Sequence, residues 1–351
     1  MNAGAPPATT PPGRYEALDA LRGVAVLMVV YDHLFAVAGE RMAGAAFAPV
    51  PWVRHWVSGP LGIIQDFGWL GVCLFFLISG FVIAHAARRE PLHVFAVRRV
   101  LRIFPPLAAA IVVAAVLHHL VGTEQPWQNY LVGVTLAGYL AVPQIIVLDV
   151  AWTLVIEVIF YVLIGVLSPL LKSRLPALAL VAGTALPLLV IVYARDFGGS
   201  FFLFAASTAY VPLLLIGSAL YLRRTGCIGL AASAVLVAAN YAVFVLGLRS
   251  IHTVFLPIEN SYLVSAAYAL GLFMLSLDRP APRALKFVGD ISYSLYLLHG
   301  TLGFFVVYRL LPYGAGMAAP IVASLVCIVA SYAFYRGVER PAMALGKRLA
   351  S

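Results

Sequence analysis

The sequence predicts an all-α membrane protein, a polytopic bundle of about ten transmembrane helices with one additional short segment. Composition is the first observation, because 63% of the 351 residues are hydrophobic and only 11% are charged. In soluble domains, about a quarter of all residues are charged. The second observation is that long apolar runs repeat along the chain. The third is that lysines and arginines gather between alternate runs, which is typical of the cytoplasmic side of a membrane.

Eleven apolar segments are candidates for these helices. They fall at about 18–38, 66–87, 103–121, 129–142, 150–171, 176–194, 204–222, 228–248, 260–277, 287–311 and 317–336. The fourth segment, 129–142, would rise only about 21 Å as a helix, which is less than the ~30 Å thickness of the hydrocarbon core.

The positions of the basic residues indicate whether segment 129–142 crosses the membrane. If it does not cross, 18 of the 23 lysines and arginines share the side of the N-terminus, and if it does cross, only 10 do. The positive-inside rule therefore favours ten spans, cytoplasmic N- and C-termini, and segment 129–142 as a re-entrant or surface element on the outer side. Basic residues on the cytoplasmic side of the membrane thus account for the net charge of +9, and we expect no nucleic-acid partner.

One membrane domain is predicted to fill the chain. We assign residues 1–13 to a disordered lead rich in Pro, Ala and Thr, residues 14–341 to the transmembrane domain, and residues 342–351 to a short cytoplasmic tail. Pro341 is expected to stop the last span. The three cysteines lie far apart in the sequence, so we predict neither a metal site nor a disulfide framework.

The first apolar segment carries four ionisable side chains. Arg22 and His33 are eleven residues apart, so at about 100° per residue they share a helix face, with His33 about 16 Å deeper. Asp19 precedes Arg22 by one turn and can pair with it. An ionisable residue at such depth usually faces a bundle interior or a wet cavity. The alternative for His33 is a structural hydrogen bond between helices. Asp32 points about 100° away from His33, and we assign it no role.

Two further segments carry ionisable residues. Arg98, Arg99 and Arg102 form a cationic cluster, with Arg99 and Arg102 on one helix face. Guanidinium groups suit phosphate, and simple anchoring at the cytoplasmic surface is the alternative. Glu157 lies inside an apolar span, where a carboxylate is costly and usually paired. It could orient His33, contact a ligand or pair with an arginine.

Other candidates have weaker support. Trp152 is either an aromatic anchor at the outer end of its span or a surface on which a ligand stacks. Tyr296 and His299 share a helix face and could line a pocket, although His299 could equally be structural. We assign no role to His118 and His119. Three glycines are expected to allow close helix packing, namely Gly68, Gly71 and Gly80.

Six segments resemble, in order and spacing, those of a known family. They are LDALRGVAVLMVVYDHL (18–34), GWLGVCLFFLISGFVI (68–83), RRVLRIFPPL (98–107), WTLVIEVIFYVL (152–163), GDISYSLYLLHG (289–300) and VERP (338–341). The family is acyltransferase 3, integral membrane enzymes that acylate carbohydrates and related hydroxyl compounds. In that family an Arg-x10-His arrangement marks the active site, and Arg22 and His33 have that spacing.

The resemblance implies a membrane O-acyltransferase, with acetyl as the expected group, that transfers groups other than aminoacyl groups. It implies acyl-CoA, with acetyl-CoA expected, as co-substrate and no permanently bound cofactor. Arg98, Arg99 and Arg102 would bind the donor on the cytoplasmic side. His33 would be the general base, since its reference pKa lies near neutrality, with Arg22 completing the family motif.

Glu157 is assigned to the catalytic set. The acceptor would be a hydroxyl of a carbohydrate or glycosylated compound, and the residues expected to bind or support it are Asp19, Trp152, Tyr296 and His299. The expected location is the lipid bilayer of a bacterial cytoplasmic membrane, with a role in the cell envelope. Direct attack on the thioester and a transient acyl-protein intermediate both fit the sequence.

Two alternative functions explain part of the pattern. A polytopic transporter or flippase for a glycan or glycolipid would also carry buried charge, but it predicts internal repeats, which we do not find. Another membrane acyltransferase architecture, acting on lipid or protein acceptors, would leave the arginine motif and SYSLYLLH unexplained.

Overall fold

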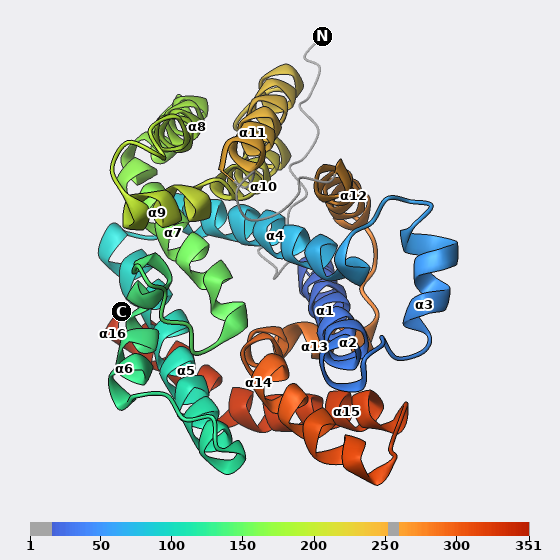
Figure 1. Cartoon of the computed structure of the whole chain (residues 1–351). Coiled ribbons are helices and arrows are strands. Elements are labelled where there is room, and N and C mark those ends of the chain that lie inside the picture. Colours follow the sequence, from blue (N-terminus) through green and yellow to red (C-terminus); the bar gives the residue numbers. More distant parts are fainter. Residues whose placement is uncertain (1–15, 252–259, 351) are drawn as a thin grey trace.

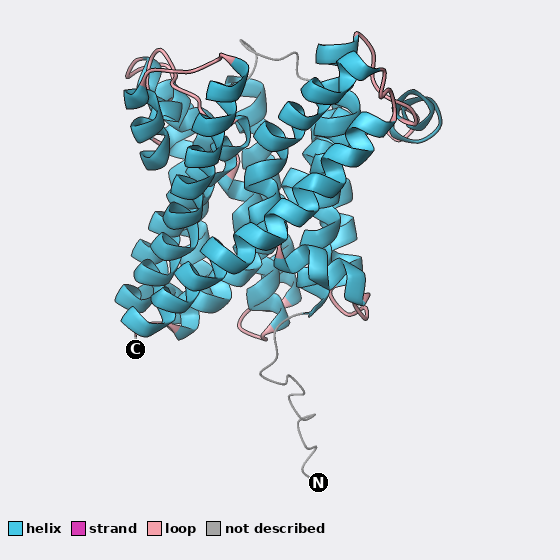
Figure 2. Ribbon diagram, turned by 90° about the horizontal axis from the view of Figure 1, so that it is seen from below, coloured by secondary structure: helices cyan, strands magenta, loops and turns pink. Residues whose placement is uncertain are grey.

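The computed structural model describes residues 16–251 and 260–350, and the regular structure within these ranges is entirely helical. The predicted disordered lead, residues 1–13, lies outside the described residues. The long helices stand side by side as a bundle (Figure 2). The all-α class predicted from the sequence is therefore confirmed.

The first half of the bundle begins with one long rod. α1 (Glu16–Tyr31) continues through a π-helical turn (Asp32–Val37) into α2 (Ala38–Ala43). The helices that follow are α3 (Val50–Val53), α4 (Gly68–Arg89), α5 (Leu92–Val121), α6 (Trp127–Thr135), α7 (Trp152–Lys172) and α8 (Pro176–Val192).

The second half contains the remaining helices. They are α9 (Gly199–Thr208), α10 (Val211–Arg224), α11 (Leu230–Ile251), α12 (Asn260–Ser276), α13 (Arg283–Asp290), α14 (Ser292–Leu310), α15 (Ala318–Phe334) and α16 (Arg340–Leu349).

Within the described residues, eight helical stretches are long and apolar enough to cross a membrane. Two shorter apolar helices, α8 and α12, coincide with the expected spans 176–194 and 260–277. Each of the ten segments that we expect to cross therefore corresponds to an apolar helix. The number of crossings and the cytoplasmic placement of the termini stay predictions.

The short segment 129–142 does not form a helix of spanning length. α6 ends at Thr135, and a 3-10 turn, Ala137–Leu140, follows it. α6 packs against α5. This geometry agrees with a short element that does not cross the membrane.

α4 lies at the centre of the bundle and packs against α1, α7, α10 and α12 (Figure 1). Glycines permit the closest of these approaches. A Cβ on Gly80 would collide with the carbonyl of Leu214 in α10, and a Cβ on Gly217 would collide with the carbonyl of Leu77. Gly71 faces the backbone of α1 in the same way. Close packing at Gly71 and Gly80 is confirmed, in keeping with the small residues common at membrane helix interfaces.

The last long helix does not end at Pro341, so the predicted helix end there is wrong. α15 continues through a π-helical turn, Tyr335–Glu339, directly into α16. Pro341 directly follows the π-helical turn, in which the Arg340 N–H bonds to the Tyr335 carbonyl, so the helix continues through the proline. Most of the predicted tail, 342–351, is therefore an ordered helix that packs against α5.

Candidate active site

Two pockets lie along the same set of helices. The arginine pocket, named for Arg22, Arg98, Arg99 and Arg102 in its wall, has a volume of about 290 Å³. The histidine pocket, which contains His33, has a volume of about 680 Å³. Both pockets are lined by residues of the α1 rod, α5, α7 and α14. α4 lines the arginine pocket, and Gln65, just before α4, lines the histidine pocket. These helices surround the centre of the bundle (Figure 1).

The two pockets take opposite ends of α5 and of α14. α5 contributes Arg98 near its start to the arginine pocket and His118 near its end to the histidine pocket. α14 likewise contributes Ser292 to the first pocket and Tyr308 to the second. The pockets are therefore arranged end to end along the bundle axis.

Arg22 and His33 follow this division. As their shared helix face predicts, each side chain lines a pocket built by the same helices. Arg22 lies in the arginine pocket, and His33 lies in the histidine pocket. The predicted pairing of Arg22 with Asp19 is confirmed, with Arg22 Nη1 donating to Asp19 Oδ1 at 3.2 Å.

In the arginine pocket, Arg99 and Arg102 form no ion pair with any carboxylate among residues 16–251 and 260–350. Arg98 pairs with Glu90 at 2.7 Å. Within the described part of the chain, no carboxylate oxygen lies within 4 Å of the guanidinium nitrogens of Arg99 or Arg102. Arg99 instead lies over the ring of Phe95, with 5.7 Å between its Cζ and the ring centroid.

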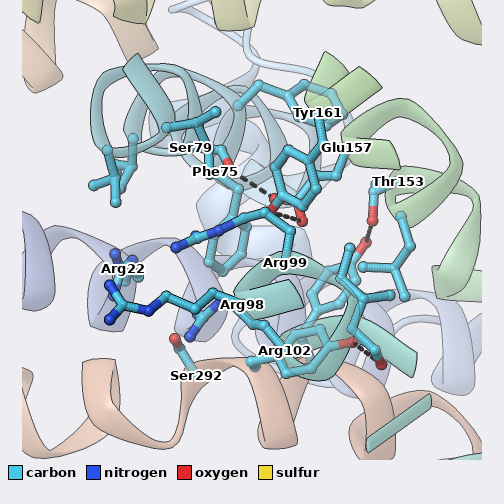
Figure 3. Close-up of a pocket in the computed structure, with 18 of the residues that line it drawn as sticks. Arg22, Phe75, Ser79, Arg98, Arg99, Arg102, Thr153, Glu157, Tyr161 and Ser292 are labelled. Atoms are coloured by element: carbon cyan, nitrogen blue, oxygen red, sulfur yellow. Dashed lines mark hydrogen bonds between the residues drawn. The ribbon is translucent and has the colours of Figure 1, made fainter. Parts of the chain in front are cut away.

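The surroundings of these arginines leave hydrogen-bonding capacity unused. Arg102 lies 5.8 Å from the centroid of Tyr293, and its Nη1 contacts Met343 Sδ at 3.3 Å. The Nε atoms of Arg98 and Arg99 are buried and have no hydrogen-bond partner among the residues that the structure describes. A buried cation without a partner is costly. The arginine pocket is therefore suited to an anionic ligand (Figure 3).

Glu157 lies in the arginine pocket and not beside His33. Its carboxylate accepts hydrogen bonds from the Ser79 hydroxyl at 2.6 Å and from the Tyr161 hydroxyl at 3.1 Å. Figure 3 shows both bonds as dashed lines, with Ser79, Glu157 and Tyr161 in the upper part of the view. These hydroxyls account for a carboxylate in an apolar span, and Glu157 as a member of the catalytic set stays a prediction.

His33 lies in the π-helical turn of the α1 rod and contacts His299 of α14. The two rings are separated by 266 positions in the sequence, and His33 Nδ1 lies 2.8 Å from His299 Nε2. The rings are nearly coplanar, with 18° between their planes. His299 is fully buried, whereas 27% of the His33 side chain is exposed. His33 therefore faces the pocket, and His299 lies behind it.

Asp32, which sequence reasoning left without a role, adjoins the base candidate. Its Oδ2 lies 3.9 Å from His33 Nε2, and both residues line the histidine pocket. On its other side, the carboxylate packs against Gly68 at the start of α4, where a Cβ would collide with it. The sequence predicted that Gly68 allows close helix packing. The structure gives Gly68 a more specific role, because its missing side chain leaves space for the Asp32 carboxylate. A helix N-terminus also favours a negative charge.

The boundary between the pockets contains three hydrogen bonds. Thr153 and Tyr296 line the arginine pocket, whereas Val150 and Trp152 line the histidine pocket. The Tyr296 hydroxyl donates to the Val150 carbonyl at 3.0 Å, and Thr153 Oγ1 lies 3.0 Å from that hydroxyl and 3.2 Å from that carbonyl. Tyr296 thus lies at the boundary between the two pockets.

The remaining wall of the histidine pocket combines aromatic and polar groups. Trp152 packs against Phe76 and Tyr210 and lines the pocket. His118, to which the sequence assigned no role, also lines it, but His119 is exposed and pairs with Glu124. Other lining groups that the sequence did not single out include Gln65, Gln125, Asp149 and Tyr308. These residues lie near or between helix ends, and only the assembled bundle brings them together in one pocket.

Comparison with known proteins gives one match. Residues 15–336 match the acyltransferase domain of the family Acyl_transf_3. Comparisons with curated proteins and with solved structures give no match. Because the matched region spans nearly all of the described bundle, including both pockets except Met343 and Lys347, the chain belongs to the acyltransferase 3 family of membrane acyltransferases.

Proposed function

We propose that this chain transfers an acyl group, with acetyl as the expected group, from acyl-CoA in the arginine pocket to a carbohydrate hydroxyl in the histidine pocket. The observation that carries this proposal is the end-to-end arrangement of the two pockets along the same helices. One pocket presents Arg99 and Arg102, which form no ion pair with a carboxylate of the described residues, and the other presents an imidazole beside a carboxylate.

The arginine pocket suits the donor. Acyl-CoA carries several phosphates, and guanidinium groups bind phosphate through charge-assisted hydrogen bonds. Arg99 and Arg102 would supply these bonds, with Arg98 and Arg22 adding positive charge. Lys347 of α16 lines the same pocket. By the positive-inside rule this end is cytoplasmic, where acyl-CoA is available.

The histidine pocket suits a carbohydrate acceptor. Sugars combine apolar ring faces, which stack on aromatic side chains, with hydroxyl groups that need hydrogen-bond partners. Trp152, Phe304 and Tyr308 offer rings, whereas Gln125 and Asp149 offer polar groups. Its volume of about 680 Å³ exceeds that of the arginine pocket. The acceptor would enter from the end of the bundle opposite α16.

The chemical step is a direct transfer with His33 as general base. His33 Nε2 takes the proton of the acceptor hydroxyl as the hydroxyl oxygen bonds to the thioester carbonyl carbon. The C–S bond then breaks, and the proton passes from His33 to the leaving thiolate, which gives an O-acyl product and CoA. Asp32, at 3.9 Å from Nε2, stabilises the imidazolium formed in between. The thin pantetheine arm would pass the Tyr296–Thr153 boundary to reach His33.

The test uses membranes that contain the full chain and radiolabelled acetyl-CoA. We expect release of CoA coupled to stable incorporation of label into a glycan or glycosylated product. Denaturing gels of the quenched reaction should show no label on the protein, and label there would instead indicate an acyl-protein intermediate. Uptake of a glycan into proteoliposomes without CoA release would contradict the proposal and favour a transporter.

A further inference from the structure

His299 is a buried histidine whose two ring nitrogens both have partners. Its Nδ1 lies 3.0 Å from the Leu295 carbonyl oxygen and 2.9 Å from the Tyr296 carbonyl oxygen, both one turn earlier in α14. Its Nε2 lies 2.8 Å from His33 Nδ1. The sequence left open whether this residue lines the acceptor pocket or is structural, and these contacts place it directly behind His33.

The partners of His299 determine which nitrogen carries its proton. A carbonyl oxygen can only accept a hydrogen bond, so Nδ1 of His299 must be the donor. A fully buried imidazole flanked by backbone carbonyls and another imidazole is neutral, because an isolated buried charge is costly. A neutral ring with its proton on Nδ1 has a free lone pair on Nε2. His299 Nε2 is therefore the acceptor in its bond with His33.

The same logic then fixes His33. Since His299 Nε2 accepts, His33 Nδ1 donates, and the single proton of the neutral His33 ring lies on Nδ1. The lone pair of His33 is left on Nε2, on the side of Asp32 and the histidine pocket. A general base needs this arrangement, with its free nitrogen directed at the proton that it abstracts.

We infer that His299 is a positioning residue for acyl transfer. Through its Nε2 it holds His33 in the Nδ1–H tautomer and fixes the ring plane, and backbone carbonyls of α14 fix His299 in turn. When His33 becomes an imidazolium, the same hydrogen bond persists, because Nδ1 remains a donor. This inference rests on the proposed role of His33 as base, and it assigns to His299 no contact with either substrate.

The test compares two substitutions of His299 in purified, folded protein with radiolabelled acetyl-CoA and the membrane acceptor. His299→Leu fills the buried space but cannot accept a hydrogen bond, so kcat should fall by about a hundredfold or more. His299→Gln retains an acceptor oxygen near the position of Nε2 and should recover at least part of that loss. The KM for acetyl-CoA should be unchanged in both variants, because the arginine pocket is untouched. Exposed His119→Leu is the matched control.

A double-mutant cycle separates positioning from a structural role. If His299 acts only through His33, the double variant His33→Ala/His299→Leu should have a kcat no lower than that of the single variant His33→Ala. Additive losses, a His299→Gln variant no faster than His299→Leu, or a His299→Leu variant with parental kcat would each overturn the inference. Parental kcat in His33→Ala would instead overturn the proposed function, and with it the base that His299 is inferred to position.

Discussion

The arginine pocket and the histidine pocket differ in how completely the protein satisfies their polar groups. In the arginine pocket, the buried Nε atoms of Arg98 and Arg99 have no hydrogen-bond partner within the described part of the chain. In the histidine pocket, the Nδ1 atom of His33 bonds to His299, and Asp32 adjoins Nε2. The first pocket therefore offers unused hydrogen-bond donors, whereas the second is organised before any ligand arrives.

This difference suits the two parts of an acyl transfer. A donor site gains binding free energy when an anion satisfies cations that lack partners. A base, in contrast, works best when its orientation is already fixed before the reaction, so that no reorganisation is needed at that moment. We therefore expect substitutions in the two pockets to affect different kinetic constants.

His33→Ala should have the largest effect. Removal of a general base typically costs about 10²–10⁴-fold in rate, and this loss should fall on kcat for acetyl transfer while the KM for acetyl-CoA stays close to the parental value. Steady-state kinetics with radiolabelled acetyl-CoA measures both constants. His119→Ala, at an exposed histidine outside both pockets, should match the parent. If His33→Ala mainly raised the KM for acetyl-CoA and left kcat unchanged, the expected difference in function between the two pockets would be contradicted.

Arg99→Ala should affect the donor instead. Hydrogen bonds to charged groups contribute about 1.5–3 kcal/mol each, so the KM for acetyl-CoA should rise about tenfold to a hundredfold. Substitution of Arg99 by Lys should restore only part of the affinity, because an ammonium lacks the planar fork that binds phosphate bidentately. Arg89→Ala is the control, since Arg89 is exposed and lies outside the pocket. An unchanged KM for Arg99→Ala would argue that Arg99 serves only as an anchor.

The sequence predicted the arginine pocket better than the histidine pocket, and the reason is distance along the chain. The Asp19–Arg22 pair and the shared face of Arg99 and Arg102 follow from i,i+3 spacing, which an α-helix converts directly into proximity. The contact between His33 and His299 spans 266 positions and depends on how α14 packs against the α1 rod. Helical periodicity carries no information about such a contact.

Two other sequence predictions show where local rules end. Pro341 predicts a helix end, but the helix continues past it through a π-helical turn, in which the Arg340 N–H bonds to the Tyr335 carbonyl. An unpaired Glu157 in an apolar span indicates a functional carboxylate, but the hydroxyls of Ser79 and Tyr161, from two helices, provide its partners. The apolar spans themselves were predictable because each depends only on its own composition.

Gly68→Ala should perturb the histidine pocket without removing any functional group. The added Cβ would collide with the Asp32 carboxylate, which must then shift from its present position beside His33. Misplacement of a positioned group by a fraction of an ångström to about 1 Å can lower a rate substantially, and we expect kcat to fall about tenfold. Gly271→Ala, in a helix with open space around the glycine, is the matched control and should leave kcat unchanged. Equal rates for the two alanine variants would show that the Asp32 position is unimportant.

Lys347→Ala should have the smallest effect and tests the outer rim of the arginine pocket. Lys347 is exposed on α16, beyond the last residue of the family match, yet it lines the same pocket as Arg98 and Arg99. Exposed ion pairs contribute about 0.2–1 kcal/mol, so the KM for acetyl-CoA should rise by no more than about fivefold, with kcat unchanged. The increase should shrink at high salt, because exposed charges are screened. Arg348→Ala, the next residue but outside the pocket wall, is the control. If both variants raise the KM equally, the general positive charge of α16 attracts the donor and no specific contact with Lys347 is needed.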